Sequence, residues 1–208
     1  PLHSQLMTRA SYDAQVTDQP AKRPYLISRC AAPGTQRYAQ TWTGDNYTSW
    51  DTLRWNIPMG LGLSLSGFYN IGHDVGGFAG PKPEPELFLR WVQNGIFHPR
   101  FTIHSWNDDG TANEAWMYPK ITPLIRKALK FRAQLIPYLY TLLYRAVTDG
   151  EPMLRPLWLD FPEDQLAQAS EFEFLLGTDL LVATVIEKGA QSRSVPLPAC
   201  TEGWWDFE

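Results

Sequence analysis

The chain has 208 residues, enough for one large domain or one and a half ordinary ones with a sizeable core. Its 18 basic and 22 acidic residues give a net charge of -4 with no long run of either sign, so neither nucleic acid nor a membrane is an expected partner. The two cysteines, Cys30 and Cys200, predict no disulfide framework and no zinc site. They favour a reducing compartment, and we expect a cytoplasmic protein.

The first half of the chain alternates between strand and helix patterns. A helical segment opens it. Strands are expected over residues 23–30, 37–42, 62–74 and 99–106. Helices are expected over residues 49–59 and 86–97. This alternation predicts an α/β fold.

A long helix is predicted from Thr122 and Pro123, a hydroxyl N-cap followed by proline, to Gly150, with a bend at Pro137. From about Pro152 the pattern changes to short apolar segments separated by proline, glycine and acidic turns. Strands are expected there over residues 153–161, 179–187 and 193–199. A second, β-rich domain is therefore expected to follow the helix.

Polar residues stand where each proposed strand of the first half ends. They are Arg29, Asp45, His73 with Asp74, and His104. Loops at one face of a parallel barrel carry active sites in this way. The alternative is that strand ends are simply where polar residues reappear. Nine tryptophans and 13% aromatic residues also suit stacking against sugar rings, although most tryptophans are simply buried.

Five segments together resemble glycoside hydrolase family 31, the α-glucosidase and α-xylosidase group. They are WTGDNYTSWDTL, GFYNIGHDVGGF, HPRFTIHS, RPLWLDFPED and LLGTDLLVATVIEKG, in this order. The resemblance implies the second half of a (β/α)8 TIM barrel over residues 1–150 and the start of a β-sandwich domain over 151–208. It also implies a retaining α-glycosidase.

The resemblance implies that Asp45 is the catalytic acid/base. It implies substrate-binding roles for Arg29, Trp42, Asp74, Phe78 and His104. Trp42 could desolvate Asp45 and raise its pKa, and Gly44 would leave room for the sugar. The alternatives are that Asp45 caps the helix near Ser49, that Arg29 forms an interior salt bridge, and that Trp42 and Phe78 are core residues.

A metal site is the rival interpretation of the polar residues. The candidate ligands are His73, Asp74, His98 and His104, but their spacing fits no standard signature. Residues 107–114 have some likeness to a calcium loop, although the ligand positions do not alternate as such a loop requires. We expect no cofactor and no metal.

The family's nucleophile precedes every segment seen here. Asp13 and Asp18 fall in the opening helix and are poor candidates for it. We therefore expect a fragment that is inactive alone, with the upstream half of the same polypeptide as its partner and an α-glycoside or oligosaccharide as substrate. The alternative is a noncatalytic carbohydrate-binding or scaffold module. The sequence leaves the sugar, hydrolysis against transglycosylation, and the oligomeric state open.

Overall fold

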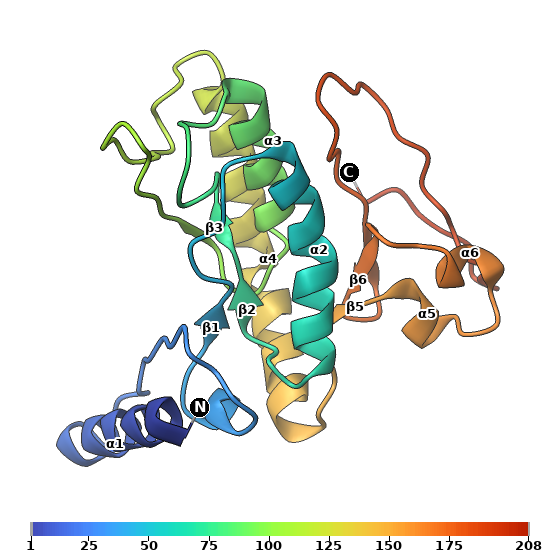
Figure 1. Ribbon diagram of the computed structural model, residues 1–208. Helices are drawn as coiled ribbons and strands as arrows, with labels where there is room; N and C mark the ends of the chain where they lie inside the picture. The colour runs from blue at the N-terminus through green and yellow to red at the C-terminus, as the bar shows by residue number, and fades with distance from the viewer. Residues whose placement is uncertain (1, 208) are drawn as a thin grey trace.

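Three helices pack beside a row of very short parallel strands in the computed structural model, which describes residues 2–207 (Figure 1). The strands are β1 (Thr41–Trp42), β2 (Ile71–Gly72), β3 (Asp74–Val75) and β4 (Thr102–Ile103). β1 pairs with β2 and β3 pairs with β4, and both pairs are parallel. Only His73 separates β2 from β3. The row therefore contains three parallel strand paths.

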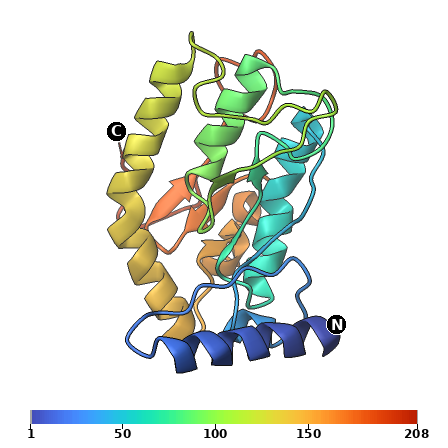
Figure 2. The same cartoon turned by 90° about the vertical axis from the view of Figure 1, so that its left-hand side faces the viewer.

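Each of these paths leads into a helix. The helices are α2 (Trp50–Leu65), α3 (Pro85–Gly95) and α4 (Thr122–Thr148). Figure 2 shows them running alongside one another, while α1 (Leu2–Asp18) crosses the lower end apart from them. Repeated strand and helix units with parallel pairing are the building pattern of an α/β barrel.

Helix α2 shows where the sequence pattern was misread. The predicted helix over 49–59 is correct, but α2 continues to Leu65, so the strand expected over 62–74 is confined to Ile71–Val75. Leu53, Ile57 and Leu61 are buried at a spacing of four residues. That spacing keeps one face of the helix in the core, and it outweighs the local alternation of leucine with glycine and serine.

The strand expected over 23–30 is wrong as a buried strand. It forms a single parallel bridge, Ile27 with Gln40, and Tyr25 is 70% exposed. No second strand among residues 2–207 pairs with its other edge. In the segment expected as a strand over 37–42, Gln40 forms this bridge and only the last two residues belong to β1, because the 3₁₀ turn η1 (Thr35–Arg37) occupies the start of the segment.

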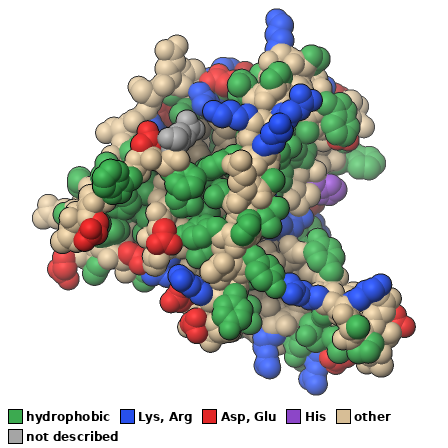
Figure 3. Space-filling model, turned by 180° about the vertical axis from the view of Figure 1, so that it is seen from behind, with side chains coloured by type: hydrophobic (Ala, Val, Ile, Leu, Met, Phe, Trp, Pro, Cys, Tyr) green, Lys and Arg blue, Asp and Glu red, His purple; other side chains and the backbone are tan. Residues whose placement is uncertain are grey.

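Helix α4 matches its predicted range and runs on through Pro137. Its N-cap differs from the prediction: Ile121 takes that position, and the Thr122 hydroxyl donates to the Tyr118 carbonyl at 2.9 Å. One face of α4 lies in the core. Ile136, Tyr140 and Tyr144 lie outside that face and are more than half exposed. Figure 3 shows hydrophobic side chains gathered across the middle of this rear face of the molecule.

The last part of the chain is an antiparallel sheet held against α2 and α4. Its strands are β5 (Leu154–Arg155), β6 (Phe174–Leu176) and β7 (Leu180–Val182), in the order β5-β6-β7. The Leu154 amide donates to Ser64 Oγ of α2 at 3.2 Å. The Tyr138 hydroxyl of α4 donates to the Leu176 carbonyl at 2.8 Å. These bonds fasten the sheet to the helices.

The strands predicted in this part are only partly right. Residues after Arg155 turn into the short helix α5 (Leu157–Asp160), because Pro156 ends the strand and Arg155 closes the turn with two bonds to Asp160. A second short helix, α6 (Gln165–Gln168), follows, capped by Asp164. β6 was not expected, and the structure assigns no strand to residues 193–199. Across residues 2–207 we find no helix with the length and apolar character of a membrane span.

Candidate active site

Asp45 follows β1 at the start of the loop that leads to α2. The preceding residue, Gly44, has φ 80°, and a Cβ there would lie 3.2 Å from Cδ of Arg29. A side chain at this position would therefore strain the backbone and crowd Arg29. The Asp45 carboxylate accepts a hydrogen bond from Arg29 Nη1 at 3.1 Å. The sequence thus places this ion pair at the carboxyl end of β1.

The surroundings of Asp45 differ from one expectation and exclude one alternative. Its side chain is 47% exposed, so the expected desolvation by Trp42 is absent in the described structure. Asp45 is also not the cap of α2, because Ser49 Oγ accepts the Thr52 amide at 3.0 Å in that role. A hollow of about 300 Å³ opens beside Asp45 and is also lined by Asp51 and Trp55. Asp45 is therefore an accessible carboxylate at the edge of a hollow.

Asp74 lies at the start of β3 and is completely buried. Burial raises the pKa of its carboxyl to about 6, although the charges of His104 and Arg100 pull that pKa down. Asp45 is close enough to push the pKa of Asp74 upward by charge repulsion. Arg100 Nη1 lies 3.8 Å from Asp74 Oδ1, beyond hydrogen-bond distance. The Asp74 carboxyl therefore gains or loses its proton near pH 6.

The loops after β1 and β3 are tied together by Asn46. Its side-chain amide donates to the Asp74 carbonyl at 3.1 Å, and its carbonyl oxygen accepts the Phe78 amide at 3.0 Å. Gly77 between them has φ 86°, and a Cβ there would fall 2.3 Å from Thr48 Oγ1. The glycine is required because the two loops approach so closely.

Phe78 and His104 form one wall of the cluster. Their ring centroids are 5.1 Å apart, with an interplanar angle of 47°. The pairing of Val75 with Ile103 brings His104 out at the carboxyl end of β4, and the Trp106 amide donates to the Phe78 carbonyl at 2.8 Å. His104 is exposed and Phe78 is half-buried. An aromatic ring and an imidazole thus lie in contact beyond the ends of β3 and β4.

Trp42, the last residue of β1, stacks on Arg100. The Arg100 Cζ lies 5.3 Å from the centre of the Trp42 ring. The indole N–H lies close enough to Asp74 to favour its ionised form, although it has no partner within hydrogen-bond distance. The N–H edge of the half-buried indole therefore lies toward Asp74.

The six residues predicted for the site come together at the carboxyl ends of the strands. Contacts and charge interactions link all of them: Arg29, Trp42, Asp45, Asp74, Phe78 and His104. Two residues of the cluster were not anticipated. Asn46 could have been noticed as a turn residue directly after the Gly-Asp pair, and Arg100 as a charge at the start of an apolar strand.

The histidines next to the cluster do not assemble a metal site. Burial and the nearby His98 lower the pKa of His73 well below its ordinary value, and burial lowers the pKa of His98 to about 4. His73 Nδ1 lies 2.8 Å from Thr43 Oγ1, and its ring meets His98 at 5.0 Å. In the part of the chain that the structure describes, no group of three or more histidines, cysteines or acids is placed to hold a metal ion.

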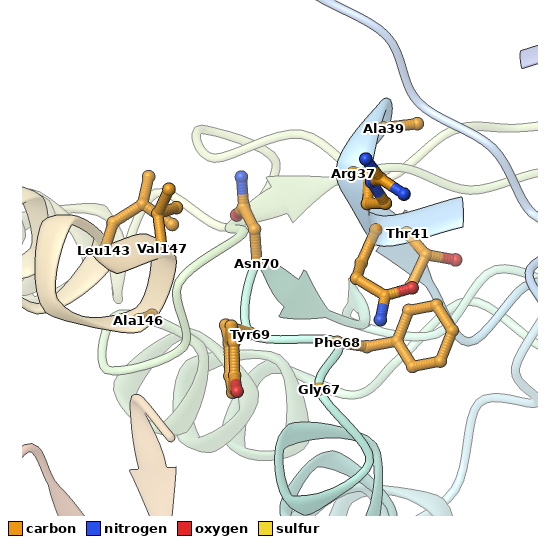
Figure 4. A pocket seen from close by; sticks show the side chains of 11 residues that line it. Arg37, Ala39, Thr41, Gly67, Phe68, Tyr69, Asn70, Leu143, Ala146 and Val147 are labelled. Atoms are coloured by element: carbon orange, nitrogen blue, oxygen red, sulfur yellow. The ribbon is translucent and has the colours of Figure 1, made fainter. Parts of the chain in front are cut away.

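The loop over 107–114 and a second hollow contain none of the six predicted site residues. In the loop, Asp109 Oδ1 accepts bonds from both the amide and the hydroxyl of Thr111. The second hollow, of about 210 Å³, lies between the start of β1, the segment before β2 and the last turns of α4 (Figure 4). It is at the amino ends of the strands, opposite Asp45, and its lining contains neither a carboxylate nor an imidazole.

Comparison with known proteins gives matches over nearly the whole chain. The model of the Glycosyl hydrolases family 31 TIM-barrel domain matches residues 2–142. The model of the Glycosyl hydrolase family 31 C-terminal domain matches residues 150–208. A "Probable glucan 1,3-alpha-glucosidase" of Arabidopsis thaliana is 43% identical over 95% of the chain, and human "Neutral alpha-glucosidase AB" is 43% identical over 90%. The chain spans 21% and 20% of the lengths of these two relatives.

Solved structures give the same result. The Tris-bound glucosidase II alpha subunit superposes with a TM-score of 0.89 at 33% identity, covering 95% of this chain and 22% of that one. A Flavobacterium johnsoniae family 31 dextranase complexed with glucose superposes with a TM-score of 0.82 at 30% identity, covering 88% and 24%. These findings confirm the fold class: part of a TIM barrel followed by a C-terminal β domain.

Proposed function

This chain belongs to glycosyl hydrolase family 31, and we propose that it supplies the acid/base and part of the sugar site of a retaining α-glucosidase. The enzyme would hydrolyse terminal nonreducing α-linked sugars by double displacement. The observation that carries the proposal is the position of Asp45. It is an exposed carboxylate beside a hollow, and it lies close enough to the buried Asp74 for their charges to interact. The α-glucosidase names of the relatives support the substrate class.

Asp45 would act twice in the reaction. In the first step its carboxyl donates a proton to the glycosidic oxygen as the bond to the anomeric carbon breaks. In the second step the carboxylate takes a proton from the water that attacks the covalent intermediate. Exposure suits this exchange with water, and Arg29 at 3.1 Å stabilises the carboxylate between the two steps.

Asp74 and His104 would bind hydroxyls of the terminal sugar. The Asp74 carboxylate has two oxygens without a hydrogen-bond partner in the described residues, although it is buried. A buried acceptor of this kind is costly unless a ligand completes it. Trp42 and Phe78 would form the apolar sides of the pocket, against the faces of the ring.

The nucleophile would come from a part of the polypeptide outside these 208 residues. A retaining mechanism needs a second carboxylate about 5 Å from the first, on the other side of the ring. We assign Asp74 to sugar binding, so it does not fill this role. The chain spans 21% of the length of the Arabidopsis thaliana relative, which is compatible with a nucleophile elsewhere in a longer polypeptide. We also propose residues 1–150 as the barrel part and 151–208 as the start of the following β-sandwich domain.

We further propose a reducing, cytoplasmic setting. Cys30 and Cys200 are both free and exposed, as expected for thiols that are not paired during secretion. Locating a tagged full-length protein by cell fractionation tests this proposal, and recovery from a secretory compartment would contradict it.

The test of function uses the longest natural polypeptide that contains this chain. We expect it to release glucose from α-glucosides with retention of configuration, seen by NMR as the α-anomer first. Asp45→Ala should slow hydrolysis of alkyl glucosides by about 10²–10⁴-fold, but slow aryl glucosides with acidic phenols far less, because only poor leaving groups need the proton. Sugar binding without turnover in the wild type would instead support a noncatalytic carbohydrate-binding module.

A further inference from the structure

A buried arginine lies beneath the candidate site and has no role in the mechanism above. Arg100 precedes β4, and its amide donates to the Ile71 carbonyl at 3.0 Å. On the facing strand, a Cβ built on Gly72 would fall 1.9 Å from the Arg100 carbonyl oxygen. Only glycine lets the two strands approach this closely. The backbone of Arg100 is therefore held at one position under the cluster.

The guanidinium of Arg100 is enclosed by groups of the site. Its side chain is 9% exposed, lies 3.8 Å from the Asp74 carboxylate and stacks at 5.3 Å on Trp42. Arg100 Nε and Nη1, both Asp74 oxygens and Trp42 Nε1 are buried and lack hydrogen-bond partners within the described residues. Unsatisfied donors and acceptors that converge in this way are rare in a finished core. They point to a ligand oxygen between them.

We propose that Arg100 is a positioning residue, which keeps Asp74 ionised and fixes the Trp42 indole so that both meet the hydroxyls of the terminal sugar. This inference rests on the proposed function. The other charged groups that face Asp74 cannot do the same. Asp45 opposes its ionisation, and His104, whose charge favours it, is exposed to solvent, whereas Arg100 is enclosed. Arg100 keeps its charge over the whole working pH range.

The pKa of Asp74 gives the proposal a measurable consequence. Burial raises this pKa to about 6, and the positive charge of Arg100 acts against that rise. Replacing Arg100 by an uncharged residue should therefore raise the pKa further. Because one pKa unit changes the ionised fraction about tenfold, the loss should be largest in mildly acidic solution and should shrink as the pH rises.

The experiment compares pH profiles of kcat/KM in the full-length enzyme. We expect Arg100→Met to lower kcat/KM about tenfold or more at pH 6, to recover much of it at pH 8, and to have little further effect in an Asp74→Asn background. Arg132→Met is the matched control. Arg132 is also an enclosed arginine stacked on an aromatic ring, Phe101 at 5.2 Å, but it donates to the backbone carbonyls of Ile96, His98 and Pro99. The fall in kcat/KM caused by Arg132→Met should therefore be the same at every pH.

A loss in Arg100→Met that does not vary with pH would overturn the proposal. If Arg100→Met does not fold, Arg100→Lys decides, because the shorter reach of the ammonium should still move the acidic limb of the profile upward. An unmoved limb would overturn the proposal too.

A second readout does not need turnover. The Asp74 contribution to the unfolding free energy, measured as the difference between proteins with Asp74 and with Asp74→Asn, should fall as pH rises toward 6, because the buried His73 and His98 cancel in that difference. In the Arg100→Met background this fall should extend to higher pH. If the wild type showed no glycosidase activity, the proposed function would fail, while this measurement would still test the effect of Arg100 on Asp74. Superimposable pH curves for wild type and variant would contradict it.

Discussion

The two ion pairs of the candidate site lie in opposite environments. At the rim, Asp45 and Arg29 are 47% and 58% exposed and 3.1 Å apart. At the floor, Asp74 and Arg100 are 0% and 9% exposed, and their closest atoms are 3.8 Å apart. An exposed pair contributes little to stability and is easily separated, whereas a buried pair without hydrogen bonds is costly to keep. The exposed pair therefore suits proton exchange by Asp45. The buried pair suits ligand binding by Asp74, because a ligand would supply the missing hydrogen bonds.

The strongest challenge to this division is an assay of the 208-residue chain alone. If Asp45 only transfers protons and Asp74 only binds sugar, no covalent intermediate can form. We expect no turnover above background, even on activated aryl α-glucosides, with circular dichroism as the check that the chain is folded. Robust turnover would mean that a carboxylate within these 208 residues acts as the nucleophile, and the assignment of the nucleophile to another part of the polypeptide would be wrong.

The next effect is on stability. Unfolded, Asp74 titrates near its ordinary value of 3.8, and folded it has a pKa of about 6. The folded state therefore binds this proton more tightly, so the contribution of Asp74 to stability is greatest below about pH 4, falls as pH rises toward 6 and then levels off. The difference of about two pKa units corresponds to at most about 3 kcal/mol.

Asp74→Asn should remove this fall, as measured by urea unfolding between pH 4 and 7. Asp45→Asn is the matched control, because this rim carboxylate is largely exposed. Parallel curves for Asp74→Asn and the wild type would show that the floor carboxylate is not strained by burial.

The smallest effect concerns the helix that follows the rim. Ser49 Oγ caps α2 by accepting the Thr52 amide, and Ser49→Ala should cost about 1 kcal/mol of unfolding free energy. Thr148→Ala is the control, because its hydroxyl donates to the Tyr144 carbonyl within α4 and caps no helix N-terminus. Equal losses would mean that Ser49 contributes no more than a surface hydroxyl does.

The structure brings together the six residues that the family resemblance singled out, and their roles stay predictions. The strands agree less well with the sequence pattern. The strands were overestimated because each paired segment is only two residues long in the barrel part, too short for an alternating pattern to mark. α2 was ended too early, since the burial of Ser64 depends on its contact with Leu154, 90 residues away. Arg100 was missed because its partners come from other strands.

The most direct test of the account is azide rescue of the full-length enzyme on an activated α-glucoside. In Asp45→Ala the glucosyl-enzyme intermediate still forms but lacks its base, so azide should attack it from the α face and give α-glucosyl azide. In Asp74→Ala azide should give no glucosyl product. Formation of β-glucosyl azide by Asp74→Ala would identify Asp74 as the nucleophile, and absence of α-glucosyl azide with Asp45→Ala would remove Asp45 from the acid/base role.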